Sequence, residues 1–288
     1  MTRAGFISFV GRPNTGKSTL TNALVGEKIA ITSDRPQTTR KAIRGIRNSD
    51  DGQLIIVDTP GLHKPRTLLG QRLNDLVQAE LADMDVIGFC CPANEEIGPG
   101  DKRIIEQLQS FPKSKKIAIV TKTDRVGPEK VASQLMALAD LAEWEQIVPV
   151  SAKSDYQIDL LADIAVSMMP ESPLLYPAET VTESSMEQRV CEEVRESALG
   201  HLQNELPHSL AVTLDEWNGD ELHLSIHVER DSQKGIIIGN KGERLSEIRQ
   251  RSQRNIRKLT GKPTRLKLHV KVSKDWQQDP KLLGRLGF

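Results

Sequence analysis

The chain has 288 residues, 38% of them hydrophobic and only 3% aromatic, which suggests about two domains with aliphatic cores. Lys and Arg number 39, as do Asp and Glu, so the formal net charge is +0. The sequence has no run of about 18 apolar residues, which excludes a predicted transmembrane helix. Its first residues lead directly into a predicted strand, so we expect no signal peptide.

The three cysteines are Cys90, Cys91 and Cys191, and none of them belongs to a CxxC pair. This usage fits a reducing cytosol and argues against a zinc site or a disulfide framework. The six histidines show no HxxxH spacing, so we expect surface or packing roles for them. The chain is therefore predicted to be cytoplasmic.

Apolar strands alternate with amphipathic segments from residue 5 to about residue 170. This alternation predicts an α/β domain whose mostly parallel, doubly wound sheet binds its ligand at the carboxyl ends of the strands. The predicted strands are 5–10, 43–48, 53–58, 85–91, 116–121 and 146–150, and the predicted helices are 17–25, 69–82, 101–110, 128–142 and 156–168.

A phosphate-binding pattern follows the first predicted strand. Residues 11–18, Gly-Arg-Pro-Asn-Thr-Gly-Lys-Ser, fit GxxxxGK[ST] between an apolar run and a helix-like segment, the context that a P-loop requires. Gly11 and Gly16 let backbone N–H groups close around phosphate oxygens. Lys17 can reach the β- and γ-phosphates, and the Ser18 hydroxyl can bind Mg²⁺. The predicted nucleotide-binding residues here are Gly11, Arg12, Pro13, Asn14, Thr15, Gly16, Lys17, Ser18 and Thr19.

The apolar run that ends at Asp58 is typical of a buried parallel strand, and Asp58-Thr-Pro-Gly61 follows at its end. Asp58 can hold a Mg²⁺-bound water, and Gly61 lets a backbone N–H approach the γ-phosphate. A polar loop, residues 33–40, lies between this motif and the P-loop and is typical of a mobile segment. Either Thr38 or Thr39 could bind Mg²⁺ there in the triphosphate state only.

Two further strand ends carry a guanine-recognition pattern. Thr121-Lys-Thr-Asp124 resembles [NT]KxD, in which Asp124 would accept two hydrogen bonds that guanine supplies and adenine cannot. The stem of Lys122 would cover the base plane. The next strand ends in Ser151, Ala152 and Lys153, where a backbone N–H would reach the guanine carbonyl. A Thr hydroxyl tethers the loop less well than an Asn amide, so Thr121 predicts somewhat weaker nucleotide affinity.

Three prolines in residues 169–177 predict an extended linker before a second domain. The pattern Ser185-Met-Glu-Gln188 indicates the start of a helix that would run to about residue 205. Asn218-Gly219 predicts a hairpin turn. The expected order is α-β-β-α-α-β, with strands 209–217, 221–230 and 264–272, a short segment before residue 243, and a helix over 243–260.

Residues 239–242, Gly-Asn-Lys-Gly, form a GxxG loop after an isoleucine run. In KH modules this loop clamps about four backbone nucleotides, because the two glycines let the sugar-phosphate chain approach. Lys241 supplies charge between them, and Ile236, Ile237 and Ile238 would line the groove floor or the core. The predicted RNA-binding residues are Gly235, Ile238, Gly239, Asn240, Lys241, Gly242, Arg244 and Arg249.

Charge is unevenly distributed in this second domain. Residues 230–275 contain fourteen Lys and Arg against four Asp and Glu, a net charge of +10, whereas residues 183–229 contain two against eleven, a net charge of −9. The basic half contains the GxxG loop. Such a concentration indicates a polyanionic partner, although a solvated helix face is the alternative for some of these cations.

GRPNTGKST, PQTTR, VDTPGLHKP, TKTD, SAK and the GxxG loop occur in the order typical of the Era family of bacterial ribosome-assembly GTPases, which the chain resembles from end to end. The resemblance implies a P-loop GTPase domain (1–170), a linker (171–183), a type II KH domain (184–274) and a tail (275–288). It also implies Mg²⁺-dependent hydrolysis of GTP to GDP and binding near the 3′ end of 16S rRNA during maturation of the 30S subunit. Loose association of a monomeric protein with the inner face of the cell membrane is a further expectation.

The resemblance also suggests how the site would be completed. Related GTPases use the second Thr of a TTR triplet for Mg²⁺, so Thr39 is preferred over Thr38. Many small GTPases orient water with a Gln where this chain has Leu62, so slow intrinsic turnover is expected. Asn14 is a candidate K⁺ ligand, with loop capping as its alternative. The predicted catalytic residues are Lys17, Thr39 and Gly61, and the predicted metal ligands are Ser18, Thr39 and Asp58.

Three other functions remain open at this point. A tRNA-modification GTPase would need a further catalytic domain, for which the chain has no room. A P-loop ATPase with an RNA module is disfavoured by Asp124. A non-catalytic RNA-binding module with a GTPase scaffold is given some weight by Leu62, and a phosphate-release assay would separate it from an enzyme.

Overall fold

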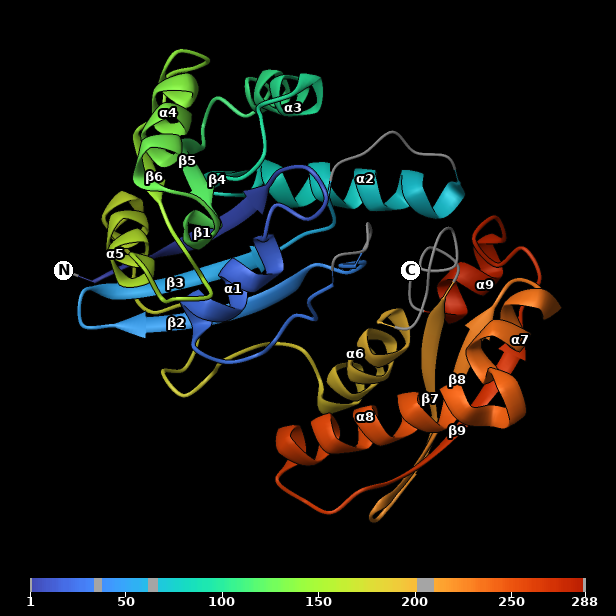
Figure 1. Cartoon of the computed structure of the whole chain (residues 1–288). Coiled ribbons are helices and arrows are strands. Elements are labelled where there is room, and N and C mark those ends of the chain that lie inside the picture. The colour runs from blue at the N-terminus through green and yellow to red at the C-terminus, as the bar shows by residue number, and fades with distance from the viewer. Residues whose placement is uncertain (1, 34–37, 62–66, 201–209, 287–288) are drawn as a thin grey trace. The chain divides into compact units, whose positions relative to one another are not determined.

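The computed structural model describes residues 2–33, 38–61, 67–200 and 210–286, and the chain divides into two compact units (Figure 1). The first unit comprises Met1–Ala30, Thr39–Lys64 and Leu73–Glu183. The second comprises Ile31–Thr38, Pro65–Arg72 and Ser184–Phe288.

The first unit is built on a six-stranded sheet. Its strands are β1 (Arg3–Val10), β2 (Ile43–Ser49), β3 (Gly52–Asp58), β4 (Val86–Pro92), β5 (Lys115–Thr121) and β6 (Gln146–Pro149), in the order β2-β3-β1-β4-β5-β6. All neighbouring pairs are parallel except the antiparallel pair β2 and β3. The strands that follow β1 in the chain are added first on one side of it (β2 and β3) and then on the other (β4, β5 and β6). The carboxyl end of β1 is therefore a topological switch point, where ligands bind in such sheets.

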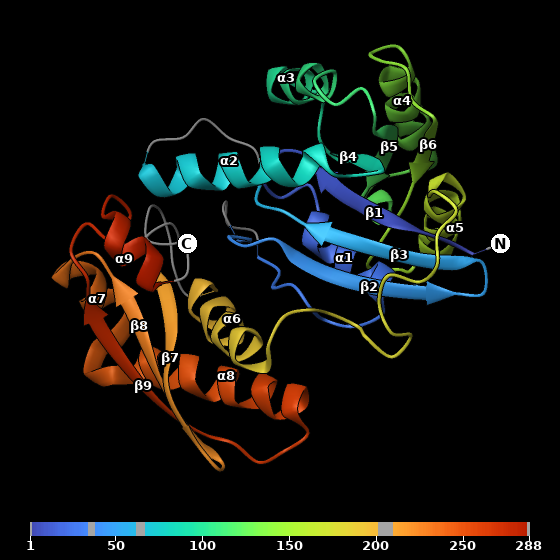
Figure 2. The ribbon, with the colours of Figure 1, turned by 180° about the vertical axis from the view of Figure 1, so that it is seen from behind.

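Helices cover both faces of this sheet (Figure 2). The helices α1 (Lys17–Val25) and α5 (Ile158–Met168) pack on one face, and α3 (Pro99–Leu108), α4 (Pro128–Ala139) and residues 73–82 of α2 (Leu68–Ala82) pack on the other. Ile56 faces the first layer and Val57 the second, and both are fully buried. Burial of both faces explains why these strands are continuously apolar, as the sequence indicated.

The linker, predicted to be extended, bends at residues 175–176 and turns at 178–179, and hydrogen bonds attach it to the first unit. The Gln53 carboxamide oxygen accepts from the backbone N–H groups of Leu175 and Tyr176, each at 2.9 Å. Farther along, the Ile46 N–H donates to the Val181 carbonyl at 2.8 Å. The segment therefore continues the edge of the sheet, which its prolines alone did not indicate.

The second unit contains a three-stranded sheet, β7 (Ala211–Asn218), β8 (Glu221–Val228) and β9 (Arg265–Val272), in which β8 pairs antiparallel with β7 and parallel with β9. The helices α6 (Met186–Leu199), α7 (Asp231–Ile238) and α8 (Glu243–Thr260) contribute apolar side chains to a core with this sheet. The short helix α9 (Pro280–Arg285) lies in the tail. The order α-β-β-α-α-β is thus present. The short segment before α8 consists of α7 and a 3₁₀ turn over Asn240–Gly242.

Local sequence signals account for the ends of these elements. Ser185 and Gln188 form the predicted capping box, in which the Gln188 N–H donates to Ser185 Oγ at 3.2 Å and the Ser185 N–H donates to Gln188 Oε1 at 3.1 Å. Gly219 occupies the hairpin turn with a φ of 58°, a value that favours glycine. The predicted end of the first helix, near residue 205, lies outside the described residues.

Candidate functional site

The P-loop connects β1 to α1 at the switch point of the sheet. Gly16 has a φ of 94°, and a Cβ on Gly11 would lie 2.6 Å from the Cys90 carbonyl oxygen, so both positions require glycine. Helix α1 begins at Lys17, so its unpaired N-terminal N–H groups face the loop. A loop of this kind at a helix N-terminus is an anion-binding site.

Lys17 is almost fully buried inside this loop. Its Nζ donates to the carbonyls of Arg12 at 2.9 Å and Gly11 at 3.2 Å. Burial lowers the pKa of Lys17, which its proximity to Asp58 opposes. Gly61 lies beside Lys17: a Cβ placed on Gly61 would be 3.5 Å from the Lys17 Nζ. The ammonium and the Gly61 backbone are therefore brought to one point.

Three side-chain oxygens converge next to Lys17. Asp58 Oδ2 accepts from Ser18 Oγ at 2.8 Å and from Thr39 Oγ1 at 2.9 Å, and the two hydroxyl oxygens are 3.0 Å apart. Burial raises the pKa of Asp58, which the two hydroxyl groups oppose. Among the described residues, the buried Asp58 Oδ1 has no hydrogen-bond partner.

This oxygen cluster fits Mg²⁺. Mg²⁺ prefers hard oxygen ligands and is usually held by one or two protein carboxylates together with phosphates and water. A buried carboxylate oxygen without a partner is costly unless something binds it. Ser18, Thr39 and Asp58, the three residues predicted to bind the metal, supply these oxygens.

Thr38 and Thr39 make different contacts. Thr39 directs its hydroxyl to Ser18 and Asp58, whereas the Thr38 carbonyl accepts a hydrogen bond from the Arg195 guanidinium within the second unit. The geometry therefore supports Thr39 as the candidate ligand. Residues 34–37 and Leu62, to which the sequence assigned roles, lie outside the described residues.

The carboxyl ends of β5 and β6 lie beside the P-loop. Thr121 Oγ1 donates to the Thr15 carbonyl at 2.6 Å, so the hydroxyl does tether the loop. Lys122, with a φ of 58°, directs its Nζ to the Asn14 carbonyl. Asp124 is exposed, and its Oδ1 accepts from Ser151 Oγ at 2.7 Å. Ala152 and Lys153 follow Ser151 at the end of β6.

The second unit presents the GxxG loop between α7 and α8. Gly239, Lys241 and Gly242 have φ values of 73°, 49° and 82°. A Cβ on Gly239 would lie 2.7 Å from the Arg244 Cβ, so this glycine is also required for packing. No atom of the described residues lies within 4 Å of a Cβ on Gly242, so that side of the loop is open. The loop therefore allows close approach of a ligand at Gly242 and Lys241.

The remaining predicted RNA-binding residues surround this loop. Gly235 and Ile238 belong to α7, and Arg244 Nη1 donates to the Ile236 carbonyl at 2.6 Å. Lys241, Asn240 and Arg249 are exposed. Of the isoleucine run, Ile237 is fully buried in the core whereas Ile236 is 38% exposed. Cations continue along α8 to a concave surface lined by Arg251, Arg254, Asn255, Arg257, Lys258 and Gly261.

Comparison with known proteins gives the family of each domain. Residues 6–123 match the family model of the 50S ribosome-binding GTPases, and residues 205–277 match that of the KH domain. The GTPase Era of Nocardioides sp. is 53% identical over 301 residues, covering 99% of this chain and 96% of the relative. The chain belongs to the Era family of GTPases.

Solved structures of Era extend this agreement to the whole fold. A variant of Aquifex aeolicus Era bound to GDP·AlF₄⁻ superposes with a TM-score of 0.94 at 34% identity, covering 99% of each chain. Era in complex with MgGDPNP and nucleotides 1506–1542 of 16S ribosomal RNA superposes with a TM-score of 0.93 at 33% identity, covering 100% of this chain and 99% of the other. The chain therefore has both the GTPase domain and the KH domain of Era.

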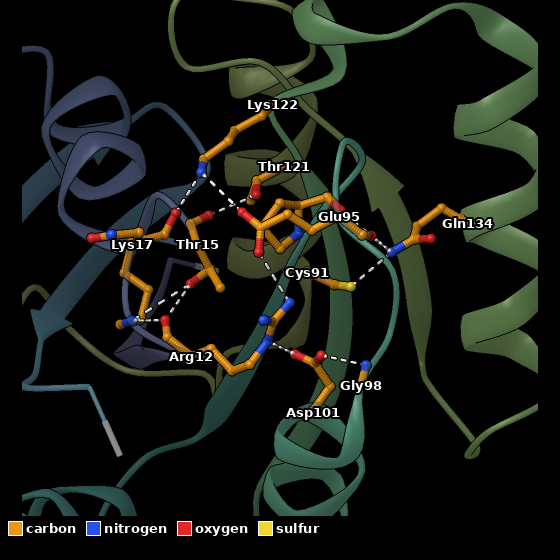
Figure 3. A network of polar contacts seen from close by, with 12 residues as sticks. Arg12, Thr15, Lys17, Cys91, Glu95, Gly98, Asp101, Thr121, Lys122 and Gln134 are labelled. Atoms are coloured by element: carbon orange, nitrogen blue, oxygen red, sulfur yellow. Dashed lines mark hydrogen bonds and ion pairs between the residues drawn. The ribbon is translucent and has the colours of Figure 1, made fainter. Parts of the chain in front are cut away.

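Beside these Era motifs, sequence reasoning missed one group of contacts. Arg12, predicted to bind nucleotide, directs its guanidinium to the carboxylates of Asp101 and Glu95 (Figure 3). Its backbone carbonyl accepts from Lys17 Nζ at 2.9 Å. Neither carboxylate belongs to a recognisable motif, and Glu95 and Asp101 lie 83 and 89 positions from Arg12.

In the part of the chain that the structure describes, no helix is long and apolar enough to cross a membrane.

Proposed function

We propose that the protein is a slow GTPase that hydrolyses GTP to GDP and phosphate and binds RNA through its KH domain. The observation that carries this proposal is the convergence of the Ser18, Thr39 and Asp58 oxygens beside Lys17. A phosphate-binding loop, a hard-cation site and a buried ammonium are the parts that phosphoryl transfer requires. The solved relative with bound GDP·AlF₄⁻ supports the same reaction.

The described residues suggest how hydrolysis is assisted. Lys17 would exchange the Gly11 and Arg12 carbonyls for β- and γ-phosphate oxygens and so stabilise the charge that develops during transfer. The Gly61 N–H would contact the γ-phosphate. Mg²⁺ bound at Ser18, Thr39 and Asp58 would neutralise phosphate charge. Because Leu62 cannot orient water, intrinsic turnover is slow.

Guanine selectivity follows from Asp124. Its carboxylate would accept two hydrogen bonds from guanine, and Ser151 holds it in place through Oδ1. Adenine lacks the matching donors, so it would leave the carboxylate oxygens of Asp124 without these two hydrogen bonds. Asp124 therefore favours a GTPase over the P-loop ATPase that the sequence left open.

The RNA partner is proposed to be the 3′ end of 16S rRNA. The open GxxG loop and the exposed cations Lys241 and Arg249 provide a backbone-binding surface, and the basic half of this domain has a net charge of +10. A relative was solved with nucleotides 1506–1542 of 16S ribosomal RNA, which supports the choice of RNA. By binding there, the protein would assist maturation of the 30S subunit.

A nucleotide-dependent switch would couple the two activities. Thr39, whose hydroxyl joins the metal-binding cluster, is consecutive with Thr38, whose carbonyl accepts from Arg195 of α6. Six residues before Thr38 in the chain, the Thr32 N–H donates to the Glu196 carboxylate of α6 at 2.9 Å. Ordering of this segment by GTP and Mg²⁺ would therefore act on the first helix of the KH domain. Linkage then requires that RNA and GTP tighten each other's binding by the same factor.

The remaining features are proposed from the sequence. The GTPase domain spans residues 1–170, followed by a connecting segment (171–183), the KH domain (184–274) and a tail (275–288). The protein would act as a cytoplasmic monomer that associates peripherally with the inner face of the membrane.

K⁺ bound near Asn14 would assist hydrolysis. Equal rates in K⁺ and Na⁺ buffers, with no effect of Asn14→Ala, would exclude that role.

Phosphate release from GTP in the presence of Mg²⁺ tests the enzymatic proposal. We expect slow but measurable hydrolysis by the wild type, and loss of nucleotide binding in Lys17→Ala. ATP should fail to compete with GTP, since Asp124 rejects adenine. RNA binding without any phosphate release, with or without RNA, would instead indicate a non-catalytic module on a GTPase scaffold.

A further inference from the structure

A cluster of charged side chains connects the P-loop to the loop between β4 and α3 (Figure 3). Arg12 Nε donates to Asp101 Oδ1 at 2.8 Å, and Arg12 Nη2 donates to Glu95 Oε2 at 3.1 Å. Asp101 is fully buried, whereas the Arg12 and Glu95 side chains are 30% and 36% exposed. The P-loop is thus attached to two carboxylates, both on chain segments that carry no nucleotide motif.

Glu95 also reaches the guanine-recognition loop. Its Oε1 lies 3.7 Å from the Lys122 Nζ, and that same Nζ donates to the Asn14 carbonyl of the P-loop. One carboxylate therefore stands between a cation of the P-loop and a cation of the loop that would cover the base. The Lys122 ammonium is therefore held between the Asn14 carbonyl and the Glu95 carboxylate.

The backbone of Glu95 and the carboxylate of Asp101 are each held by a further contact. Gln134 of α4, which is 8% exposed, donates through Nε2 to the Glu95 carbonyl at 3.2 Å and to the Pro92 carbonyl at 3.3 Å. Asp101 Oδ2 accepts from the Gly98 N–H at 2.9 Å in the first turn of α3, where the helix dipole favours a negative charge. Rigid helices α3 and α4 therefore set the positions of Asp101 and Glu95.

We propose that Glu95 and Asp101 are positioning residues for guanine nucleotide binding, an inference that rests on the proposed GTPase function. Through Arg12 and Lys122 they hold the P-loop and the Lys122 stem, which would cover the base, in the positions that nucleotide binding requires. Preorganising these loops removes an ordering cost that nucleotide binding would otherwise have to offset. Removing the cluster should therefore weaken binding of GTP and GDP alike, with little effect on the chemical step.

Glu95→Ala and Glu95→Gln test this role, with the exposed neighbour Glu96→Gln as the matched control. We expect the Kd of GTP and of GDP to rise about three- to fivefold in Glu95→Ala, the scale of partly exposed ion pairs. Glu95→Gln should lie between Glu95→Ala and the wild type, and the difference should shrink in 1 M salt because exposed charges are screened. The turnover number at saturating GTP should stay within about twofold of the wild type.

A second readout needs no nucleotide. Amide hydrogen exchange of residues 12–16 in the nucleotide-free protein should be faster in Glu95→Ala than in Glu96→Gln, while the melting temperature stays unchanged. Asp101→Asn should weaken binding more, by about tenfold, because an amide offers one acceptor oxygen to the two donors, Arg12 Nε and the Gly98 N–H, that the buried Asp101 carboxylate receives. Should that variant fold poorly, the Glu95 variants decide the matter alone.

The outcomes separate this inference from the function beneath it. Wild-type protein that fails to bind GTP would refute the proposed function. Wild-type protein that binds GTP, with Glu95→Ala binding it equally well, would refute only the positioning role. The same loss of affinity in Glu96→Gln would also overturn the role, because it would reflect only the loss of a negative charge on this surface. So would a loss accompanied by a lower melting temperature of Glu95→Ala, because it would reflect a less stable protein.

Discussion

Ser18 Oγ and Thr39 Oγ1 lie 3.0 Å apart and both donate to the same oxygen of Asp58, although the two residues are 21 positions apart. Ser18 is held by the first turn of α1, and Asp58 by the end of β3. Only Thr39 comes from an irregular segment. The hydroxyl of Thr39 is therefore the part of the cluster that a change of nucleotide can move most easily.

Thr39→Ala should lower the Mg²⁺-dependent GTPase rate by about tenfold or more, the scale of losses around metal sites. It removes one of three converging oxygens, whereas Thr38→Ala leaves all three and should have a smaller effect. The check is hydrolysis measured against Mg²⁺ concentration in both variants. A larger loss in Thr38→Ala would assign the ligand to the other threonine.

Asp124→Asn should weaken GTP binding by at least about 100-fold and improve binding of xanthosine triphosphate, because the amide reverses the donor pattern that the base meets. Ser151→Ala is the control, since it removes only the hydroxyl that donates to Asp124 Oδ1. We expect that control to cost a few-fold in GTP affinity. Competition binding with the two nucleotides measures both, and unchanged preference in Asp124→Asn would contradict the assignment.

Thr121→Val keeps the shape of the side chain but removes the hydrogen bond to the Thr15 carbonyl. The loss should raise the Kd of GTP about fivefold, which corresponds to roughly 1 kcal/mol for one hydrogen bond. Thr121→Asn should bind GTP more tightly than the wild type, since an amide can tether the loop and donate once more. Equal affinity in all three proteins would show that this tether does not limit binding.

His227 of β8 predicts a pH dependence of stability. Burial lowers its pKa below the ordinary value of 6.5, nearby Lys271 lowers it further, and Asp215 opposes them. Between the lowered folded value and 6.5 the unfolded chain binds more protons, so stability rises with pH in that window. The stability that neutral His227 contributes is complete above about pH 6.5 and is lost as the pH falls through the folded pKa.

Urea unfolding of the wild type and His227→Gln at several pH values from 5 to 8 checks this expectation. The wild type should lose stability relative to the variant as the pH falls below 6.5. Gln can keep one of the contacts that His227 makes to Thr213 and Ser273, so the comparison isolates the titration. Parallel pH profiles for the two proteins would contradict it.

Lys241→Gln should weaken RNA binding at all sequences and reduce the salt dependence of binding by about one phosphate contact. Lys130→Gln, an exposed change on α4, is the control and should bind as the wild type does. Gly239→Asp is a less clean test, since a side chain there would meet Arg244 in the folded loop. An unchanged affinity and salt slope in Lys241→Gln would argue against RNA contact at the GxxG loop.

Much of the fold followed from patterns in the sequence. The apolar runs of β1, β3 and β5 are buried on both faces, so they predicted strands directly, and α1 begins and ends as predicted because glycines flank it. The site motifs were predictable for the same reason, because each one follows a buried strand. Thr39 depended on a family resemblance, and its hydroxyl does lie with Ser18 and Asp58.

Contacts between distant segments could not be predicted. Gln53 holds Leu175 and Tyr176, and Arg12 is paired with Asp101, yet nothing local in the chain marks any of these partners. Such pairs depend on how helices and loops pack in three dimensions, and the local patterns of a single sequence do not predict that packing. The burial of Ile237 beside the exposed Ile236 likewise depends on the exact turn of α7.

The most direct test of the coupled switch is GTP hydrolysis in K⁺ and Mg²⁺, measured with and without an RNA of the 16S 3′ terminal sequence. We predict faster hydrolysis with the RNA in the wild type and no such stimulation in Lys241→Gln, whose basal rate should be normal. A rate that is indifferent to RNA, alongside tight RNA binding, would contradict the account and show that the GTPase and KH domains act independently.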